Sequence, residues 1–245
     1  MTGAALVTGA AGGIGAAVCR HLAAAGWPVV AADLEAPATP HAALGFDLLD
    51  DAAREAALDE VTRRFGRIGA LVHAAGIGQE ARFLDTSRTD FERLVAVNLT
   101  GTFLMVQAVA RRMVADGGGG AIVTLASTAG QLGSMRRTGY AAAKAGVINL
   151  SQTAAAELAR HGVRVNVLSP GPVLTDLAAR MHSPETRAAF AARVPLGRYG
   201  SVHEIAACAA FLVSPAAGYV TGHVLTADGG FTAVPAMLNE GAHER

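Results

Sequence analysis

Three polar residues in the middle of the chain have the types and spacing of an acid/base site: Ser127, Tyr140 and Lys144. Tyr140 and Lys144 stand four residues apart, so on a helix they would share one face. A phenol, with an ordinary pKa of about 10, is a poor base at neutral pH, but a neighbouring ammonium favours its ionised form. Tyr140 could then exchange protons with a substrate, while Ser127 hydrogen-bonds the substrate oxygen whose charge changes.

A glycine-rich segment near the N-terminus has the residues of a phosphate-binding turn. The segment Thr8-Gly9-Ala10-Ala11-Gly12-Gly13-Ile14-Gly15 follows a short apolar run and opens an alanine-rich helical pattern. Backbone N–H groups and the positive end of a helix would meet there, which suits a diphosphate. Gly9 permits a tight turn, Gly13 permits a phosphate to approach, and Gly15 permits close packing of helix on strand. The segment therefore predicts a nucleotide site.

Two carboxylates could recognise the rest of a dinucleotide. Asp33 follows the second apolar run, where a carboxylate about 20 residues beyond the glycine turn can bind both hydroxyls of an adenosine ribose. It would repel a 2′-phosphate, and no Arg or Lys occurs in the turn or in the four residues after Asp33. We therefore expect NAD(H) rather than NADP(H). Asp47 could accept a hydrogen bond from the adenine amino group, or instead form an Asx turn or a helix cap.

Short apolar runs alternate with helical patterns along the whole chain. The predicted strands span residues 4–7, 29–32, 45–46, 70–73, 121–125, 163–168 and 224–226, and residues 35–43 are expected to form an irregular loop. The predicted helices span residues 13–25, 52–65, 91–114, 140–160, 176–193 and 202–213. This alternation predicts a single α/β domain over residues 1–245, a doubly wound, Rossmann-like parallel sheet with helices on both faces. Ligands bind at the carboxyl ends of such strands, where Asp33 and Ser127 fall.

The composition argues against several classes of protein. No apolar stretch reaches the roughly 18–20 residues that cross a bilayer, and the N-terminus lacks a basic region ahead of a long apolar core. Twenty basic residues balance twenty acidic ones, so no electrostatic footprint indicates nucleic acid or a membrane surface as partner. Cys19 and Cys208 have no ligand spacing and are expected to be reduced core thiols. We expect a small-molecule substrate, no metal and a cytoplasmic location.

The glycine turn, Ser127 and Tyr140-x-x-x-Lys144 together resemble the short-chain dehydrogenase/reductase family in its shorter soluble form, over nearly the whole chain. The resemblance implies that Asn98, in Val97-Asn98-Leu99-Thr100-Gly101, is the catalytic asparagine that holds a water in a proton relay ending at Lys144. The segment Pro170-Gly171-Pro172-Val173-Leu174-Thr175 is similar to the one that covers the nicotinamide in the family.

The resemblance also assigns the individual contacts with the cofactor NAD. They would be made by the turn with its Ile14, by Ala75 and Gly76 after the fourth strand, by Pro170 and Gly171, by the backbone of Val173 and by the hydroxyl of Thr175. One position departs from the family, which usually has Asn where this chain has His73. That Asn steadies the central strand, so we expect a structural role for His73 rather than a catalytic one.

By this resemblance the reaction is reversible hydride transfer between the nicotinamide and a substrate carbinol carbon. Tyr140 would take the hydroxyl proton, Lys144 would lower the pKa of Tyr140 and bind the nicotinamide ribose, and Ser127 would hold the substrate oxygen. Segments 202–213 and 223–230 resemble the family's subunit contacts, which implies a homotetramer or, failing that, a dimer.

Three loops should frame the substrate. They contribute Gln79, then Arg136 and Arg137, and then a lid around 176–194 with Met181 and Phe190. Apolar lid residues indicate an apolar or cyclic substrate body. The arginines could bind a carboxylate bidentately, or they could be solvated loop charges.

Two other functions stay open. Framework features, among them the run Gly119-Gly120-Ala121-Ile122-Val123-Thr124-Leu125-Ala126-Ser127, resemble the family's dihydrodiol branch, which oxidises cyclohexadiene diols such as 2,3-dihydro-2,3-dihydroxybenzoate. The second alternative is a non-catalytic NAD-binding sensor or scaffold. Its usual sign is loss of the tyrosine or the lysine, and Tyr140 and Lys144 are both present.

Overall fold

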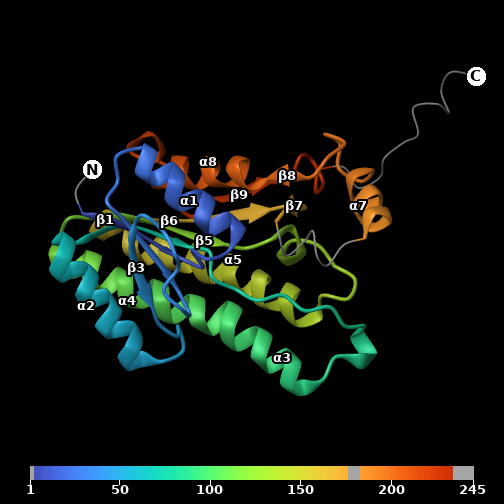
Figure 1. Ribbon diagram of the computed structural model, residues 1–245, viewed down its shortest axis with the longest axis horizontal. Coiled ribbons are helices and arrows are strands. Elements are labelled where there is room, and N and C mark those ends of the chain that lie inside the picture. The colour runs from blue at the N-terminus through green and yellow to red at the C-terminus, as the bar shows by residue number, and fades with distance from the viewer. Residues whose placement is uncertain (1–2, 176–182, 234–245) are drawn as a thin grey trace, which may run out of the picture.

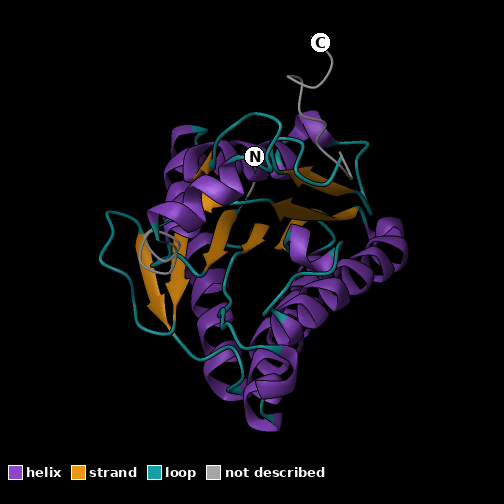
Figure 2. Ribbon diagram, turned by 90° about the vertical axis from the view of Figure 1, so that its right-hand side faces the viewer, coloured by secondary structure: helices purple, strands orange, loops and turns teal. Residues whose placement is uncertain are grey.

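A computed structural model describes residues 3–175 and 183–233, in which seven parallel strands form one sheet between layers of helices (Figures 1 and 2). The strand order is β3-β2-β1-β4-β5-β6-β9. The strands are β1 (Ala4–Thr8), β2 (Val29–Asp33), β3 (Ala42–Gly45), β4 (Ile68–His73), β5 (Gly120–Leu125), β6 (Val163–Pro170) and β9 (Val224–Ala227). The doubly wound parallel sheet predicted from the sequence is confirmed.

The helices begin and end close to the predicted positions in most cases. They are α1 (Gly13–Ala24), α2 (Asp51–Phe65), α3 (Arg88–Val95), α4 (Gly101–Asp116), α5 (Thr138–Leu158), α7 (Pro184–Ala191) and α8 (Val202–Val213). Side-chain caps fix several starts. The Asp50 carboxylate accepts from the Ala53 N–H before α2, and Ser201 and Glu204 form a reciprocal capping box at the start of α8.

The central strands are apolar at consecutive positions because both faces of the sheet are covered. In β1, Ala5 and Val7 pack in a core cluster with α1 and α8, whereas Ala4 and Leu6 pack in a second cluster with α2 and α4. Cys19 lies in the first cluster, where burial raises the pKa of its thiol to about 11. The consecutive apolar residues that predicted buried parallel strands are explained by this two-sided packing.

The long predicted helix 91–114 is interrupted in the structure. Helix begins at Arg88 and ends at Asp116, but residues Ala96–Thr100 form a π-helical turn between α3 and α4. The amide of Asn98 donates to the Leu94 carbonyl at 2.9 Å, the acceptor that the backbone N–H of Asn98 would use in a regular α-helix. The apolar pattern continues through the turn, so the sequence period alone does not reveal it.

Two further elements differ from the predicted ones. Residues 42 and 43, expected in a loop, begin β3, which ends at Gly45 rather than starting there. This edge strand is only half-buried, and its residues, Ala42-Ala43-Leu44-Gly45, are apolar but lack the β-branched side chains that mark the central strands. A two-residue parallel pair, β7 (Val173–Leu174) with β8 (Gly200–Ser201), is too short to leave a sequence pattern.

The continuous helical segment Arg88–Asp116 is long and apolar enough, by length and composition alone, to cross a membrane. Half of its most apolar window is buried inside the molecule, as in the core helix of a folded domain. Figure 1 shows α3 and α4 running beneath the sheet beside α2 and α5. The segment therefore acts here as a packing element that carries Asn98.

Candidate active site

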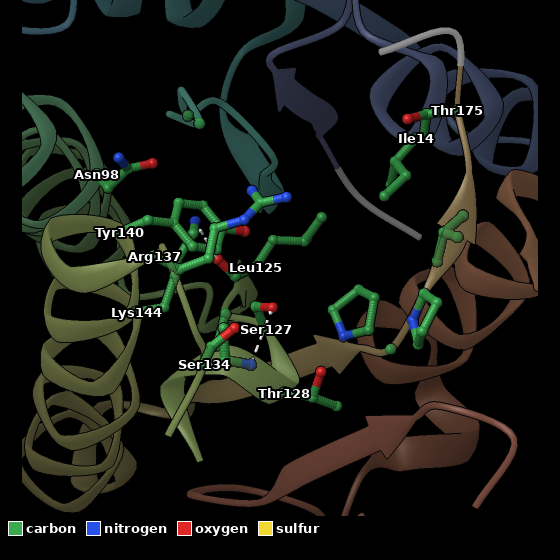
Figure 3. A pocket seen from close by; sticks show the side chains of 18 of the residues that line it. Ile14, Asn98, Leu125, Ser127, Thr128, Ser134, Arg137, Tyr140, Lys144 and Thr175 are labelled. Carbon is green, nitrogen blue, oxygen red and sulfur yellow. Dashed lines mark hydrogen bonds between the residues drawn. The ribbon is translucent and has the colours of Figure 1, made fainter. Parts of the chain in front are cut away.

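A cavity of about 880 Å³ opens at the carboxyl edge of the sheet (Figure 3). It is bordered by the ends of β1, β4, β5 and β6, by the start of α5 and by residues near α7 and β9. The parallel register places Thr8 beside His73 and His73 beside Thr124, so these strand ends lie level with one another. The predicted site residues that line the cavity are Gly9, Gly13, Ile14, Gly15, Gly76, Asn98, Ser127, Arg137, Tyr140, Lys144, Pro170, Gly171, Val173, Thr175 and Phe190.

The glycine turn is built so that no side chain enters it. Gly9 has a φ of 71°, and a Cβ there would lie 2.5 Å from the backbone nitrogen of Ala75. A Cβ on Gly15 would collide with the carbonyl oxygen of Gly9. At Gly13 a Cβ would lie 3.5 Å from Val202 and 3.8 Å from Thr175, at ordinary contact distance, so this backbone borders the cavity without a side chain of its own. This bare backbone at the start of α1 fits a diphosphate.

Asp33 adjoins this turn at the end of β2. Its carboxylate accepts from the backbone N–H groups of Ala11 at 2.9 Å and Leu34 at 2.8 Å. Asp33 itself does not border the cavity, and neither does Ala75, whose backbone packs against Gly9. Both therefore stay predictions as cofactor contacts.

Asp47 takes the alternative role considered for it. Its carboxylate accepts from the Leu49 N–H at 2.9 Å, and its backbone carbonyl accepts from the Asp50 N–H at 3.2 Å. These bonds form an exposed Asx turn ahead of α2, outside the cavity lining. The structure thus does not bring Asp47 to the cavity.

Lys144 is buried one helical turn beyond Tyr140 on α5. Its Nζ donates to the carbonyl of Leu125 at 2.7 Å and lies 5.7 Å from the centre of the Tyr140 ring. Burial lowers the pKa of Lys144 to about 8, because the charged form loses its hydration. The helix geometry expected from Tyr140-x-x-x-Lys144 is confirmed, and the strand end anchors the ammonium beside the phenol.

Ser127 and Arg137 act on Tyr140 from two other sides. Burial raises the pKa of the Tyr140 phenol, while a hydrogen bond with Ser127 and the charge of Arg137 lower it. Burial is the largest of the three effects, so the pKa lies above its ordinary value in the protein alone. From the sequence we expected neighbouring cations to make Tyr140 a base at neutral pH. The cations present in the protein do not do so by themselves. A further positive charge in the cavity would act in the needed direction.

Asn98 is fixed within the π-turn by three hydrogen bonds. Its Oδ1 accepts from the Ile77 N–H at 3.1 Å, and its Nδ2 donates to the carbonyls of Ile77 at 3.0 Å and Leu94 at 2.9 Å. A Cβ on Gly76 would lie 2.6 Å from Asn98 Oδ1 and 3.5 Å from Lys144 Nζ, which shows how close the three residues are. The turn places Asn98 at the cavity, and π-turns often occur at functional sites.

His73 sits beneath the cavity at the end of the central strand. Its Nδ1 hydrogen-bonds the hydroxyl of Thr8 at 2.7 Å, and Nε2 is buried without a partner among the described residues. Burial, together with the charge of Lys144, lowers the pKa of His73 to about 3. His73 is therefore neutral and ties β4 to β1, which is the structural role expected of it.

The substrate side differs from the prediction in detail. Arg137 and Phe190 line the cavity, whereas Gln79 and Arg136 border a separate, much smaller one of about 10 Å³. Gln79 is turned away because its Oε1 accepts from Arg93 at 2.6 Å. Arg136 has a φ of 63° within a tight connection, where its carbonyl accepts from the Ala81 N–H at 3.0 Å. Met181 lies outside the described residues.

Several residues that line the cavity were not predicted from the sequence. The cavity is also lined by Leu132, Met135, Arg193, Tyr199 and Phe231. They come from the loop before α5 and from segments on both sides of α8. No spacing connects them in the sequence, so only the tertiary structure could reveal them.

Comparison with known proteins agrees with this geometry. A family model described as enoyl-(acyl carrier protein) reductase matches residues 9–232. (3R)-3-hydroxyacyl-CoA dehydrogenase of Mus musculus is 40% identical over 92% of this chain and 95% of its own length. Cis-4-hydroxycyclohexanecarboxylate dehydrogenase of Sinomonas cyclohexanicum is 40% identical over 94% of this chain and 96% of its own.

A solved short-chain type dehydrogenase/reductase from Mycobacterium marinum has the same fold. It is 34% identical and superposes with a TM-score of 0.90, covering 95% of this chain and 96% of that one. The family-model match over residues 9–232 contains Ser127, Tyr140, Lys144 and most of the glycine turn. The chain belongs to the short-chain dehydrogenase/reductase family and is an oxidoreductase acting on secondary alcohols.

Proposed function

We propose that this protein is an NAD(H)-dependent dehydrogenase that interconverts a secondary alcohol, with a cyclic or apolar body, and its ketone. The observation that carries the proposal is the meeting of the glycine turn with Ser127, Tyr140, Lys144 and Asn98 in one cavity. The open backbone of the turn and the small residues after β4 fit a dinucleotide. A nicotinamide bound there supplies the hydride acceptor in oxidation and the hydride donor in reduction.

The chain's own residues handle the proton and orient the substrate. During oxidation, Tyr140 takes the proton of the substrate hydroxyl and Ser127 hydrogen-bonds the same oxygen. Lys144, anchored on the Leu125 carbonyl, keeps a positive charge beside the phenolate that forms. Asn98, fixed on Ile77, holds the water through which protons pass between Lys144 and solvent. These roles follow from the family resemblance and from the positions of the four side chains.

The preference for NAD(H) rests on Asp33. Its carboxylate lies beside the glycine turn through the Ala11 N–H, and a 2′-phosphate next to it would meet like charge. We expect kcat/KM with NAD⁺ to exceed that with NADP⁺ by tenfold or more. Asp33→Ser should reduce this ratio, whereas Asp47→Asn, a carboxylate change in an exposed turn, should leave it as it is. Equal use of both cofactors by the unaltered protein would refute the assignment.

The shape of the cavity supports a cyclic substrate. Phe190 and Tyr199 meet edge to face with ring centres 6.2 Å apart, and Phe231 adds a third ring to the lining. The relative from Sinomonas is named for a cyclohexane alcohol, which agrees with such a wall. Cyclic secondary alcohols should therefore be oxidised with a higher kcat/KM than acyclic ones of equal carbon number.

The first test is nicotinamide absorbance against a panel of secondary alcohols, cyclic diols and ketones, with NAD(H) and NADP(H) in parallel. Turnover of a cyclic secondary alcohol with NAD⁺ would support the proposal. Tight NADH binding without turnover of any panel member would instead favour a sensor. We further propose a homotetramer and a cytoplasmic location; a monomer by light scattering would contradict the assembly.

A further inference from the structure

The described lining of the cavity carries positive charge without any balancing carboxylate. Its charged side chains are Arg137, Lys144 and Arg193, and no Asp or Glu borders the cavity in residues 3–175 and 183–233. Charge of one sign in a cleft attracts the opposite sign in a ligand. Whether a ligand can use it depends on which of these cations already has a partner.

Two of the three cations are already engaged within the protein. Lys144 is buried, donates to the Leu125 carbonyl and lies beside Tyr140. Arg137 forms an ion pair with Glu80 at 2.8 Å, and both side chains are largely buried, 22% and 33% exposed. Glu80 therefore offsets the charge of Arg137, the residue that the sequence had suggested for a substrate carboxylate.

Arg193 differs from both. Its guanidinium lies 5.2 Å from the centre of the Phe231 ring, and it forms no ion pair with any carboxylate in the described part of the chain. Stacking on an aromatic face holds the plane of the guanidinium but leaves its N–H edge free. Such an edge matches a carboxylate or phosphate in a two-point contact.

Arg193 lies two residues beyond the end of α7 and borders the cavity. Its backbone N–H donates to the Phe190 carbonyl at 3.0 Å. Phe190, Tyr199 and Phe231 line the cavity next to it. A substrate held by Tyr140 would therefore meet apolar rings and the Arg193 guanidinium within the same cavity.

We propose that Arg193, stacked on Phe231, binds an anionic group on the substrate, so that the preferred substrate is a secondary alcohol with an apolar body and a terminal carboxylate or phosphate. The proposal rests on the proposed function and names the class of substrate for the same site. Phe231 sets the orientation of the guanidinium, and Arg193 sets the distance from the reacting hydroxyl to the anion.

The test compares matched pairs of alcohols that differ only in charge. We would measure kcat/KM for 3- and 4-hydroxycyclohexanecarboxylate and for their methyl esters, with NAD⁺. The protein should favour an acid over its ester by tenfold or more. Arg193→Gln should remove most of this preference, and Arg193→Lys should keep part of it, because lysine is a point charge that cannot make the forked contact. Arg111→Gln, which removes an exposed arginine on α4, is the matched control and should keep the full preference.

A binding measurement decides whether Arg193 binds the anionic group of the substrate or the diphosphate of the cofactor. Calorimetry with cyclohexanecarboxylate in the presence of NADH should show weaker binding to Arg193→Gln, with the dissociation constant of NADH unchanged. A weakened NADH affinity of similar size would assign the guanidinium to the cofactor diphosphate and overturn the proposal. Equal loss of kcat/KM for acid and ester would do so as well.

The proposed function and this inference fail in different ways. If neither acid nor ester is oxidised with NAD⁺ or NADP⁺, the proposed reaction is wrong, and the calorimetric comparison still decides whether Arg193 binds a carboxylate. If the esters are oxidised as well as the acids, the dehydrogenase proposal stands and the anion-binding role of Arg193 is wrong.

Discussion

The tight contact among Gly76, Asn98 and Lys144 makes one added methyl group a sharp test of the site. In Gly76→Ala the new Cβ would lie 2.6 Å from Asn98 Oδ1, whereas ordinary contacts begin at 3.4 Å. The two atoms must therefore separate by about 0.8 Å, the difference between these distances. Lys144 Nζ lies 3.5 Å from the same Cβ position, which is already contact distance. The new methyl group therefore cannot relieve the clash by moving toward Lys144.

The energetic cost follows from the hydrogen bonds of Asn98. Its side chain is fully buried and makes three of them, at 2.9, 3.0 and 3.1 Å. Losing the bond from the Ile77 N–H to Oδ1 would leave a buried donor unpaired, at a cost of about 1–3 kcal/mol. For a chain of this size each kcal/mol lowers Tm by about 2–4 °C. We also expect kcat to fall at least tenfold, because Asn98 no longer holds its place beside Lys144.

The assay combines urea unfolding with steady-state kinetics on the best alcohol of the panel. Gly133→Ala is the matched control, since Gly133 lines the same cavity but no atom lies within 4 Å of its Cβ position. We expect its unfolding free energy to stay within about 0.5 kcal/mol of the parent, as for most substitutions free of strain. If Gly76→Ala matches this control in both stability and kcat, then Asn98 is not clamped as the structure indicates.

Three further predictions address the protonation, chemistry and stability of the fold. His73 stays neutral when buried, with its pKa lowered from 6.5 to about 3, while the unfolded chain takes up a proton below pH 6.5. Stability should therefore fall as the pH drops from 6.5 toward 3, by at most about 1.4 kcal/mol per pH unit. Urea unfolding at pH 7 and pH 5 should show this loss in the parent and a smaller loss in His73→Asn. Equal losses in the two proteins would contradict the prediction. Tyr140→Phe should abolish turnover while calorimetry still shows NADH binding, and retained turnover would rule out Tyr140 as the acid/base. Ser201→Ala removes one half of the capping box with Glu204 and should cost about 1 kcal/mol of unfolding free energy. A change in Tm no larger than that of Thr153→Ala, at an exposed position on α5, would show that the box contributes little.

Asn98 shows which structural features a local sequence pattern can predict and which it cannot. The resemblance to the family marked Asn98 as catalytic, and the sequence pattern placed it within a long helix. The helix exists, but it widens into a π-turn at Asn98, whose own side chain bonds Leu94 and Ile77 there. A period of apolar residues reports which face of a helix is buried, and it is insensitive to one altered hydrogen bond along that face.

Asp33 and Asp47 show the same limit for strand ends. Both were placed after a strand from the sequence, and both do lie at the carboxyl edge. Asp33 bonds the glycine turn, whereas Asp47 bonds the backbone two residues ahead and stays exposed. An aspartate after a strand has either choice, because its short side chain reaches local N–H groups as easily as a ligand.

The sequence by itself determined the parallel sheet, the glycine turn and the pairing of Tyr140 with Lys144. These depend on interactions between residues close in the chain or on two-sided burial, which leaves a direct mark on composition. The tertiary structure alone decided that Arg137 is neutralised by Glu80, that Arg136 and Gln79 face away from the cavity, and that Arg193 stacks on Phe231 within it. Loop side chains are positioned by partners far apart in the chain, and their orientation follows from packing that no local spacing encodes.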